Sequence, residues 1–296
     1  MLDAFEEIQG VQGDPVVYLN GQYLPLSQAG VSVLDRGFIF GDGIYEVVPI
    51  YQRQPFRMQE HLDRLERSLG ELEITPPMTR SQWQALITAL LDQQPTLATA
   101  MIYIQVTRGV AKRDHAFPNP PVKPTVFAMV APMTPPGEQL RTQGVRAISI
   151  EDIRWLRCDI KSVSLLGNVL AKQAAVKAGV DEVIQFRDGI MTEGAACNVW
   201  MVENGKVYGA PKDNKVLQGI RYGLFESLCQ ACGLSLVLEP ITQQRVVQAQ
   251  ELMVSSATRE VLPVVALDDQ PVGDGQPGPV YQRLRQAYDA CLAQLV

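Results

Sequence analysis

Strand-type and helix-type hydrophobic patterns are mixed in both halves of this 296-residue chain. Residues 43–58, GIYEVVPIYQRQPFRM, have the pattern of two strands joined by a short polar turn. Residues 59–74 change to helical spacing, with Leu62, Leu65, Leu69 and Leu72 on one stripe. Because neither half shows a regular strand–helix–strand rhythm, a doubly wound parallel sheet is disfavoured. The pattern predicts a mixed α+β fold.

A proline-rich segment divides the chain into two predicted domains. Residues 132–139, PMTPPGEQ, contain three prolines, which stiffen the backbone and cannot join a central strand. We therefore expect a smaller N-terminal domain of sheet and two helices at residues 1–131. A larger C-terminal domain is expected at residues 140–296, after the linker.

The overall charge and the cysteine content limit the class of partner and the compartment. The formal net charge is -6, whereas nucleic acids and anionic membranes select for basic surfaces. Five scattered cysteines do not form a disulfide framework, and no apolar run approaches the roughly 20 residues of a membrane span. We expect a cytoplasmic protein that binds neither nucleic acid nor membrane. With only two histidines, His61 and His115, no metal site is expected.

One lysine, Lys161, stands in an apolar setting where a strand runs into a predicted helix. Its neighbours in RCDIKSVSLLGN include Ile160, Val163 and Leu165. An unpaired charge is costly to bury, so a lysine in such a stretch is more often a surface residue whose ammonium reaches water. The alternative is a lysine held in a dry pocket as an amine nucleophile that forms a Schiff base. The stretch alone leaves both interpretations open.

Residues elsewhere in the chain would complete a cofactor site around such a lysine. Arg64 shares a helix face with His61 and Ser68, and its planar guanidinium suits a phosphate. The predicted helix start at Gly219 and the turn VSSATRE offer backbone N–H groups and hydroxyls to an anion. Glu193 lies between small and apolar residues, where it needs a cation or a donor such as a protonated heterocyclic nitrogen. Each feature has an ordinary structural explanation, but together they describe a pyridoxal phosphate site.

Four segments resemble the fold-type IV pyridoxal-phosphate enzymes, a family that contains D-amino acid aminotransferases, branched-chain aminotransferases and aminodeoxychorismate lyases. The segments are SVLDRGFIFGDGIYEV, EHLDRLERS, DIKSVSLLGNVLAKQ and TEGAACNVW, within a likeness that covers residues 16–267. The resemblance implies a two-domain fold with a barrel-like C-terminal domain, and it makes Lys161 the lysine that carries the cofactor. The other cofactor contacts that it implies are Arg64 at the phosphate, Glu193 at the pyridine nitrogen, Leu217 behind the ring, and Ile220, Arg221, Ser256 and Ala257 around the phosphate.

The segment AKRDHAFP resembles the RxH element of the D-amino acid aminotransferases, whose arginine and histidine help to bind the substrate carboxylate. Arg113 and His115 occupy these positions, and Tyr45 in GIYEV matches the third member of this carboxylate trap. On a strand, residues i and i+2 point the same way, so both side chains would reach one ligand. The resemblance also implies a homodimer in which this loop is lent by the neighbouring subunit. We therefore expect transamination of D-alanine-like donors, with 2-oxoglutarate as the acceptor.

Other activities are alternatives to this one. Branched-chain L-amino acid or (R)-amine transamination and aminodeoxychorismate lysis use the same scaffold, and the RxH element argues against them. A non-catalytic pyridoxal phosphate carrier belongs to a different class of protein. The retained lysine and glutamate, together with a complete carboxylate trap, argue against a carrier.

Some positions depart from the family pattern. Relatives often have a hydroxyl-rich run after TEG, where this chain has Ala195, Ala196 and Cys197. Arg221 and Ala257 replace threonines near the expected phosphate site. Backbone donors or Arg221 would then substitute for side-chain hydroxyls at the phosphate.

Overall fold

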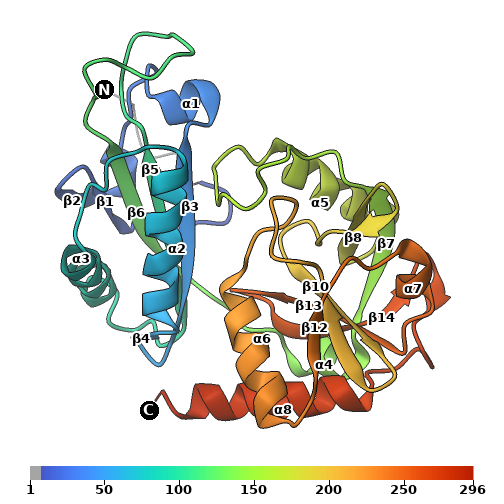
Figure 1. The fold of residues 1–296 in the computed structure, drawn as a ribbon. Coiled ribbons are helices and arrows are strands. Elements are labelled where there is room, and N and C mark those ends of the chain that lie inside the picture. The colour runs from blue at the N-terminus through green and yellow to red at the C-terminus, as the bar shows by residue number, and fades with distance from the viewer. Residues whose placement is uncertain (1–7, 296) are drawn as a thin grey trace. The chain divides into compact units, whose positions relative to one another are not determined.

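The computed structural model describes residues 8–295, which form two compact units (Figure 1). The first unit contains the described residues up to Met133 together with Ile160–Ser164. The second contains Thr134–Asp159 and the described residues from Leu165 onward. The segment that carries Lys161 therefore belongs to the first unit, although the chain on either side of it belongs to the second.

Within its described residues, the first unit is built on a six-stranded sheet in the order β2-β1-β6-β5-β3-β4, in which all neighbours are antiparallel. Its elements are β1 (Val16–Leu19), β2 (Gln22–Pro25), the 3-10 helix η1 (Leu26–Gln28), α1 (Arg36–Phe40), β3 (Gly43–Tyr51), β4 (Gln54–Pro55), α2 (Met58–Glu71), α3 (Arg80–Asp92), β5 (Ala100–Thr107) and β6 (Thr125–Pro132).

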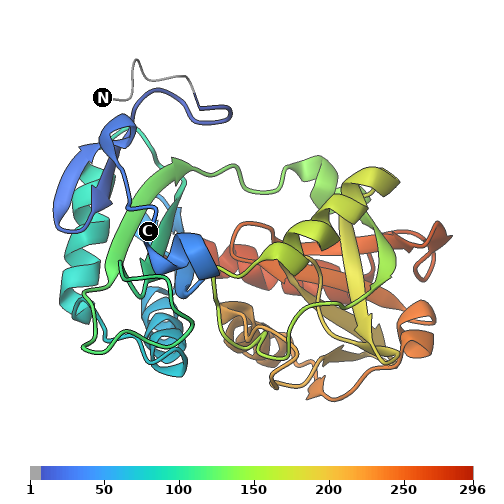
Figure 2. The same cartoon turned by 90° about the horizontal axis from the view of Figure 1, so that it is seen from above.

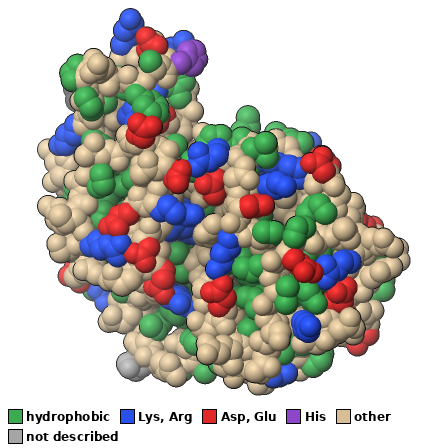
Figure 3. Space-filling model, in the orientation of Figure 1, with side chains coloured by type: hydrophobic (Ala, Val, Ile, Leu, Met, Phe, Trp, Pro, Cys, Tyr) green, Lys and Arg blue, Asp and Glu red, His purple; other side chains and the backbone are tan. Residues whose placement is uncertain are grey.

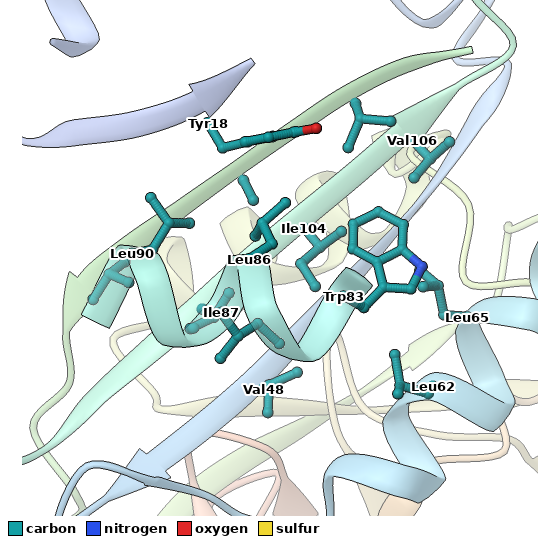
Figure 4. Packing of buried hydrophobic residues seen from close by; sticks show 14 of the residues in the cluster. Tyr18, Val48, Leu62, Leu65, Trp83, Leu86, Ile87, Leu90, Ile104 and Val106 are labelled. Atoms are coloured by element: carbon teal, nitrogen blue, oxygen red, sulfur yellow. The ribbon is translucent and has the colours of Figure 1, made fainter. Parts of the chain in front are cut away.

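The core of the first unit lies between the sheet and the helices α2 and α3. The leucine stripe predicted for residues 59–74 is confirmed for Leu62, Leu65 and Leu69, which are all buried in α2. Leu72 follows the end of the helix and packs against the core while only partly buried. Figure 4 shows Leu62 and Leu65 beside Trp83 of α3 and directed toward the strands. Every second residue of β3 and β5 points into this core, which is the alternation that a half-buried strand produces.

Within its described residues, the second unit is built on a nine-stranded sheet in the order β12-β11-β10-β13-β14-β7-β8-β9, with β15 paired to β14. Three pairs of neighbours are parallel, namely β11 with β12, β14 with β7, and β7 with β8, and the rest are antiparallel. The elements are α4 (Glu138–Gln143), β7 (Val145–Glu151), α5 (Leu166–Ala178), β8 (Glu182–Arg187), β9 (Ile190–Met191), β10 (Asn198–Glu203), β11 (Lys206–Gly209), α6 (Ile220–Ala231), β12 (Leu236–Leu238), α7 (Gln243–Val247), β13 (Glu251–Ser256), β14 (Glu260–Leu267), β15 (Gln270–Pro271) and α8 (Pro279–Ala293).

Helices cover this second sheet without a repeating strand–helix alternation. Helix α5 lies along β7 and β8, and α6 packs beside α8 (Figures 1 and 2). The mixed strand directions and the irregular order confirm the predicted α+β class. Within the described part of the chain, no helix is both long enough and apolar enough to cross a membrane.

Candidate functional site

Backbone hydrogen bonds fix Lys161 against the beginning of β3. The Tyr45 N–H donates to the carbonyl of Lys161 at 3.0 Å, and the Val163 N–H donates to the carbonyl of Gly43 at 3.0 Å. The Lys161 N–H in turn donates to Ser68 Oγ of α2 at 3.4 Å. The position of Lys161 is thus set by the sheet and by α2 of the first unit.

The amine of Lys161 lies over an aromatic ring. Its Nζ atom is 4.0 Å from the centroid of the Tyr45 ring, and the residue is half-buried. A ring face attracts a cation and reduces the contact of the amine with water. The contact distinguishes Lys161 from a lysine whose ammonium extends freely into water.

A glycine lets the lysine segment approach α1. Gly41 ends α1 with φ +66°, a left-handed conformation that L side chains rarely adopt. Ser164 Oγ donates to the carbonyl of Gly41 at 3.0 Å. A Cβ on Gly41 would lie only 2.5 Å from Ser164 Oγ, so the contact requires glycine.

The face of α2 that carries Arg64 is buried. His61, Arg64 and Ser68 are all buried, so Arg64 is not a solvated helix arginine. Arg64 donates from Nε and Nη2 to the two carboxylate oxygens of Glu46 on β3, at 2.6 and 2.8 Å, and His61 Nδ1 lies 2.9 Å from Glu46 Oε2. Burial raises the pKa of Glu46, but Arg64 and then His61 lower it more, so that it lies below its ordinary value.

Glu193 in the second unit is the acceptor at the centre of a buried group of donors. Arg154 Nη1, the Leu217 N–H (3.1 Å) and Asn198 Nδ2 (3.3 Å) all donate to its carboxylate. Burial raises the pKa of Glu193, and the positive charge of Arg154 partly offsets this. Arg154 is itself held by Asp152, whose two oxygens accept from its Nε and Nη2 at 2.9 and 2.8 Å.

The other predicted cofactor residues of the second unit lie on three segments. Leu217 directly precedes the start of α6 and contacts Glu193 through its N–H. Ile220 is the first residue of α6, whose N-cap Gly219 makes no side-chain hydrogen bond within the described chain. Ser256 ends β13, with Ala257 following it, and Ser256 Oγ accepts from the Arg259 N–H at 3.1 Å. Arg221 lies in the first turn of α6, and its side chain is outside the part that the structure describes.

Arg113 and His115 lie on an exposed loop between β5 and β6. A loop between these two strands agrees with the basic, proline-rich sequence of this stretch. The strand alternation considered for Arg113 and His115 does not apply, because the stretch forms no ladder with a neighbouring strand among the described residues. The two side chains are nevertheless together, since both lie against Phe40 of α1. The Arg113 guanidinium carbon is 5.5 Å from the Phe40 ring centroid, and the His115 ring centroid is 5.4 Å from it.

Sequence reasoning missed the residues that hold these side chains. Glu46 had a usable signal, because it is the one carboxylate within the alternating apolar pattern of β3. No signal in the sequence marked Arg154 or Asp152, because the stretch before Lys161 has the composition of an ordinary charged loop. Arg36 likewise gave no sign that it would contact residues far along the chain.

Comparison with known proteins identifies the class of protein that carries these features. A family model described as amino-transferase class IV matches residues 43–267, and the chain belongs to that family. Among curated proteins, it is similar to a D-alanine aminotransferase of Staphylococcus epidermidis, at 41% identity over 273 residues that cover 92% of this chain and 96% of the relative. It is also similar to a D-alanine aminotransferase of Bacillus licheniformis, at 37% identity over 271 residues that cover 92% and 95%.

Solved structures with lower sequence identity share the fold. A T.th. branched-chain amino acid aminotransferase with pyridoxamine 5'-phosphate superposes with a TM-score of 0.88 at 24% identity, covering 96% of each chain. A branched-chain amino acid aminotransferase from Escherichia coli gives a TM-score of 0.85 at 22% identity, covering 94% of each chain. These likenesses establish the fold-type IV architecture expected from the four sequence segments.

Proposed function

We propose that this protein is a pyridoxal-phosphate-dependent D-amino acid aminotransferase that transfers the amino group of D-alanine-like donors to 2-oxoglutarate. The observation that carries the substrate class is the placement of Arg113 and His115 against one ring, Phe40. An arginine fork and an imidazole held together on an exposed loop suit a carboxylate. The similarity to proteins named D-alanine aminotransferase supports the same assignment.

The chemistry of the donor set fits pyridoxal phosphate. Lys161 supplies an amine, and Glu193 supplies a buried carboxylate whose pKa is raised by burial. The start of α6 at Ile220, with no capping side chain in the described residues, supplies backbone N–H groups for a phosphate. The further phosphate contacts that we propose are Arg64, Arg221, Ser256 and Ala257, with Leu217 against the ring.

The chain's own groups would then perform the proton transfers. When bound, the cofactor supplies an electron sink for the negative charge that develops at the substrate α-carbon. Lys161 Nζ would hold the cofactor covalently at rest and would remove the α-proton of the substrate as a general base. It would then deliver that proton, as a general acid, to the cofactor carbon that bears the amino nitrogen. The ring of Tyr45, 4.0 Å below Nζ, orients this amine.

Glu193 would accept a hydrogen bond from the ring nitrogen and keep that nitrogen protonated. Burial, which raises the pKa of Glu193, makes its ionised carboxylate depend on nearby positive charge, and a protonated ring nitrogen would supply such a charge. Arg154, Asn198 and the Leu217 N–H fix the orientation of the carboxylate before the cofactor binds. Such preorganisation avoids reorganisation during the reaction.

Tyr45, Arg113 and His115 would bind the substrate carboxylate, and we propose that Arg113 and His115 serve the site of a partner subunit. Exposed apolar side chains support a homodimer. In the first unit, Val33 and Phe38 are each 72% exposed, and Phe38 lies on α1, whose Phe40 contacts Arg113 and His115. In the second, Leu166, Val169 and Leu170 are exposed on one face of α5. Contiguous exposed apolar residues of this kind mark protein interfaces.

The proposal includes a cytoplasmic location and small-molecule substrates. All five cysteines are free, which suits a reducing compartment. Acidic and basic side chains are interspersed on the face shown in Figure 3. A mixed surface of this kind does not favour a polyanion as the partner.

A coupled assay tests the proposed function. Purified protein with pyridoxal phosphate and 2-oxoglutarate is given D-alanine or L-alanine, and pyruvate is measured. We expect a rate with D-alanine that far exceeds that with L-alanine. Equal rates, or a preference for L-leucine, would move the chain to the branched-chain enzymes. Bound cofactor without turnover of any amine would support the carrier.

A further inference from the structure

We propose that Arg36 is a positioning residue, which holds the backbone of the loop at residues 113–116 in the shape that presents Arg113 and His115 to a carboxylate. The proposal deepens the proposed function and rests on it, because the loop is taken to bind the substrate. Arg36 itself would touch neither substrate nor cofactor.

Three successive carbonyls of the loop accept hydrogen bonds from one guanidinium. Arg36 Nη1 donates to the carbonyls of Asp114 at 2.6 Å and Ala116 at 3.2 Å, and Nη2 donates to that of His115 at 3.4 Å. The backbone therefore curves around the guanidinium, while the side chains of Arg113 and His115 are exposed. A planar fork with five donors can satisfy several carbonyls at once, which a single ammonium cannot do.

The guanidinium is anchored on its other side by a partly buried carboxylate. Arg36 Nε donates to Asp42 Oδ2 at 2.7 Å, and the Arg36 side chain is only 4% exposed. Asp42 also accepts from Arg108, at 2.8 Å from Nε and 3.1 Å from Nη2. Arg108 donates further to the carbonyls of Leu72 and Glu73 after α2. The loop is thus tied through one carboxylate to the body of the first unit.

Aromatic contacts fix the two ends of the loop. The centroid of the Phe40 ring lies 4.8 Å from the Arg36 guanidinium carbon, and the same ring contacts Arg113 and His115. At the other end, the Phe117 ring lies 3.5 Å from the Arg108 guanidinium carbon. Because cation–π contacts add to the charge-assisted hydrogen bonds, the exposed loop keeps a defined shape.

The variants Arg36→Gln and Arg36→Lys test the proposal, with Arg53→Gln as the matched control. Arg53 lies in the same unit, donates to the carbonyls of Gln94 and Leu91 and pairs with Asp92, but holds the end of α3 instead of the loop. For Arg36→Gln we expect KM for D-alanine to rise about tenfold or more, since a lost charge-assisted hydrogen bond costs about 1.5–3 kcal/mol. The kcat value and the affinity for pyridoxal phosphate should change much less.

A double-variant comparison separates positioning from a general loss of structure. In an Arg113→Ala, His115→Ala background, adding Arg36→Gln should lower kcat/KM no further, because the groups that it positions are gone. Trypsin should cleave after Lys112 or Arg113 faster in Arg36→Gln than in the wild type, whereas Arg53→Gln should match the wild type. If Arg36→Gln does not fold, Arg36→Lys is measured in the same ways, since its ammonium retains the Asp42 pair but not the three carbonyls.

Either of two kinetic results overturns the proposal. One is a KM for D-alanine in the folded Arg36 variant that equals that of Arg53→Gln. The other is a loss of kcat/KM on adding Arg36→Gln to the Arg113→Ala, His115→Ala background that equals the loss on adding it to the wild type. The trypsin measurement does not depend on turnover. If the wild type fails to use D-alanine, the proposed function fails, and an unchanged cleavage rate would separately overturn the role of Arg36.

Discussion

At the scale of single residues, Lys161 and Glu193 are each held by partners that limit how they can move. Lys161 is fixed by backbone bonds to β3 and by the ring of Tyr45. Glu193 is fixed by Arg154, Asn198 and the Leu217 N–H. A group that is already oriented loses little entropy on binding, which is what a catalytic site requires.

We predict that Lys161→Ala abolishes covalent attachment of the cofactor. Borohydride reduction of the wild type with pyridoxal phosphate should add the cofactor mass to the peptide that contains Lys161, as seen by mass spectrometry. The control is Lys177→Ala, because Lys177 is exposed at the end of α5. It should keep both labelling and turnover. Labelling of another lysine in the wild type would contradict the assignment.

We predict that Glu193→Gln lowers kcat by about a hundredfold or more, because an amide cannot keep the ring nitrogen protonated. The fold should survive, since Arg154 retains its two hydrogen bonds to Asp152. Steady-state kinetics and a thermal melt give the two readouts. Glu226→Gln removes an exposed partner of Lys212 and serves as the control, with kcat unchanged. Unaltered kcat in Glu193→Gln would mean that another group contacts the nitrogen.

At the scale of elements, α2 and β3 are joined by a buried charge pair. Arg64 and His61 on α2 both contact Glu46 on β3. Removing one member of a buried pair leaves the other charge uncompensated, which costs about 3–5 kcal/mol. The pair therefore fixes the helix against the strand that begins beside Lys161.

We predict that Glu46→Gln lowers the free energy of unfolding by about 3 kcal/mol at pH 7. The folded-state pKa of Glu46 lies below its ordinary value of 4.5, so its ionised form stabilises the fold above that value. The contribution is lost as pH falls from 4.5 through the folded-state pKa, so the difference between wild type and variant should narrow there. Urea unfolding at several pH values measures it.

A surface pair on the same helix is the control for this prediction. Glu60 pairs with Arg57 at 2.7 Å in the first turn of α2, and its side chain is exposed. Glu60→Gln should cost less than about 1 kcal/mol, as exposed pairs do. Equal losses of the free energy of unfolding for Glu46→Gln and Glu60→Gln would show that the buried pair adds no more stability than the exposed pair.

Alanine substitutions at two glycines with nearly equal φ angles distinguish the cost of backbone strain from the cost of a steric clash with the lysine segment. Gly41 and Gly179 both end helices, with φ +66° and +67°, but only Gly41 has an atom, Ser164 Oγ, where a Cβ would lie. Gly179→Ala should cost about 1 kcal/mol of backbone strain. We predict a larger loss for Gly41→Ala, measured as a lower midpoint in thermal unfolding, because Ser164 must also move. Equal midpoints would show that the contact relaxes freely.

At the scale of the whole molecule, the proposed homodimer makes a test of the shared site possible. Lys161→Ala protein is expected to be inactive and Arg113→Ala protein to retain only a small residual activity, and subunits are exchanged after mixing. If Arg113 serves the partner's lysine, each mixed dimer has one intact site, and random exchange restores about a quarter of wild-type activity. Activity that stays at background after demonstrated exchange would place Arg113 in its own chain's site. A mixture of Lys161→Ala with a protein that carries both changes is the inactive control.

The amino-acid pattern alone predicted the local features of this protein. The leucine stripe and the buried face of α2 follow from helical spacing, which is a property of neighbouring residues. The hairpin between β1 and β2 follows from Asn20-Gly21, whose φ angles of 51° and 100° are both positive. The family resemblance, carried by four short segments, likewise led to the correct fold and family.

Only the tertiary structure decided which distant groups meet. Arg154 contacts Glu193 across 39 positions of the sequence, and Arg36 contacts Asp114 across 78. The segment at Lys161 joins the first unit, although its flanks belong to the second. Periodicity and turn chemistry depend on a few neighbouring residues, and they say which way a side chain points. The partner that a buried charged side chain meets depends on how the strands and helices pack. A buried charge must be paired, and the packing decides which oppositely charged group lies close enough.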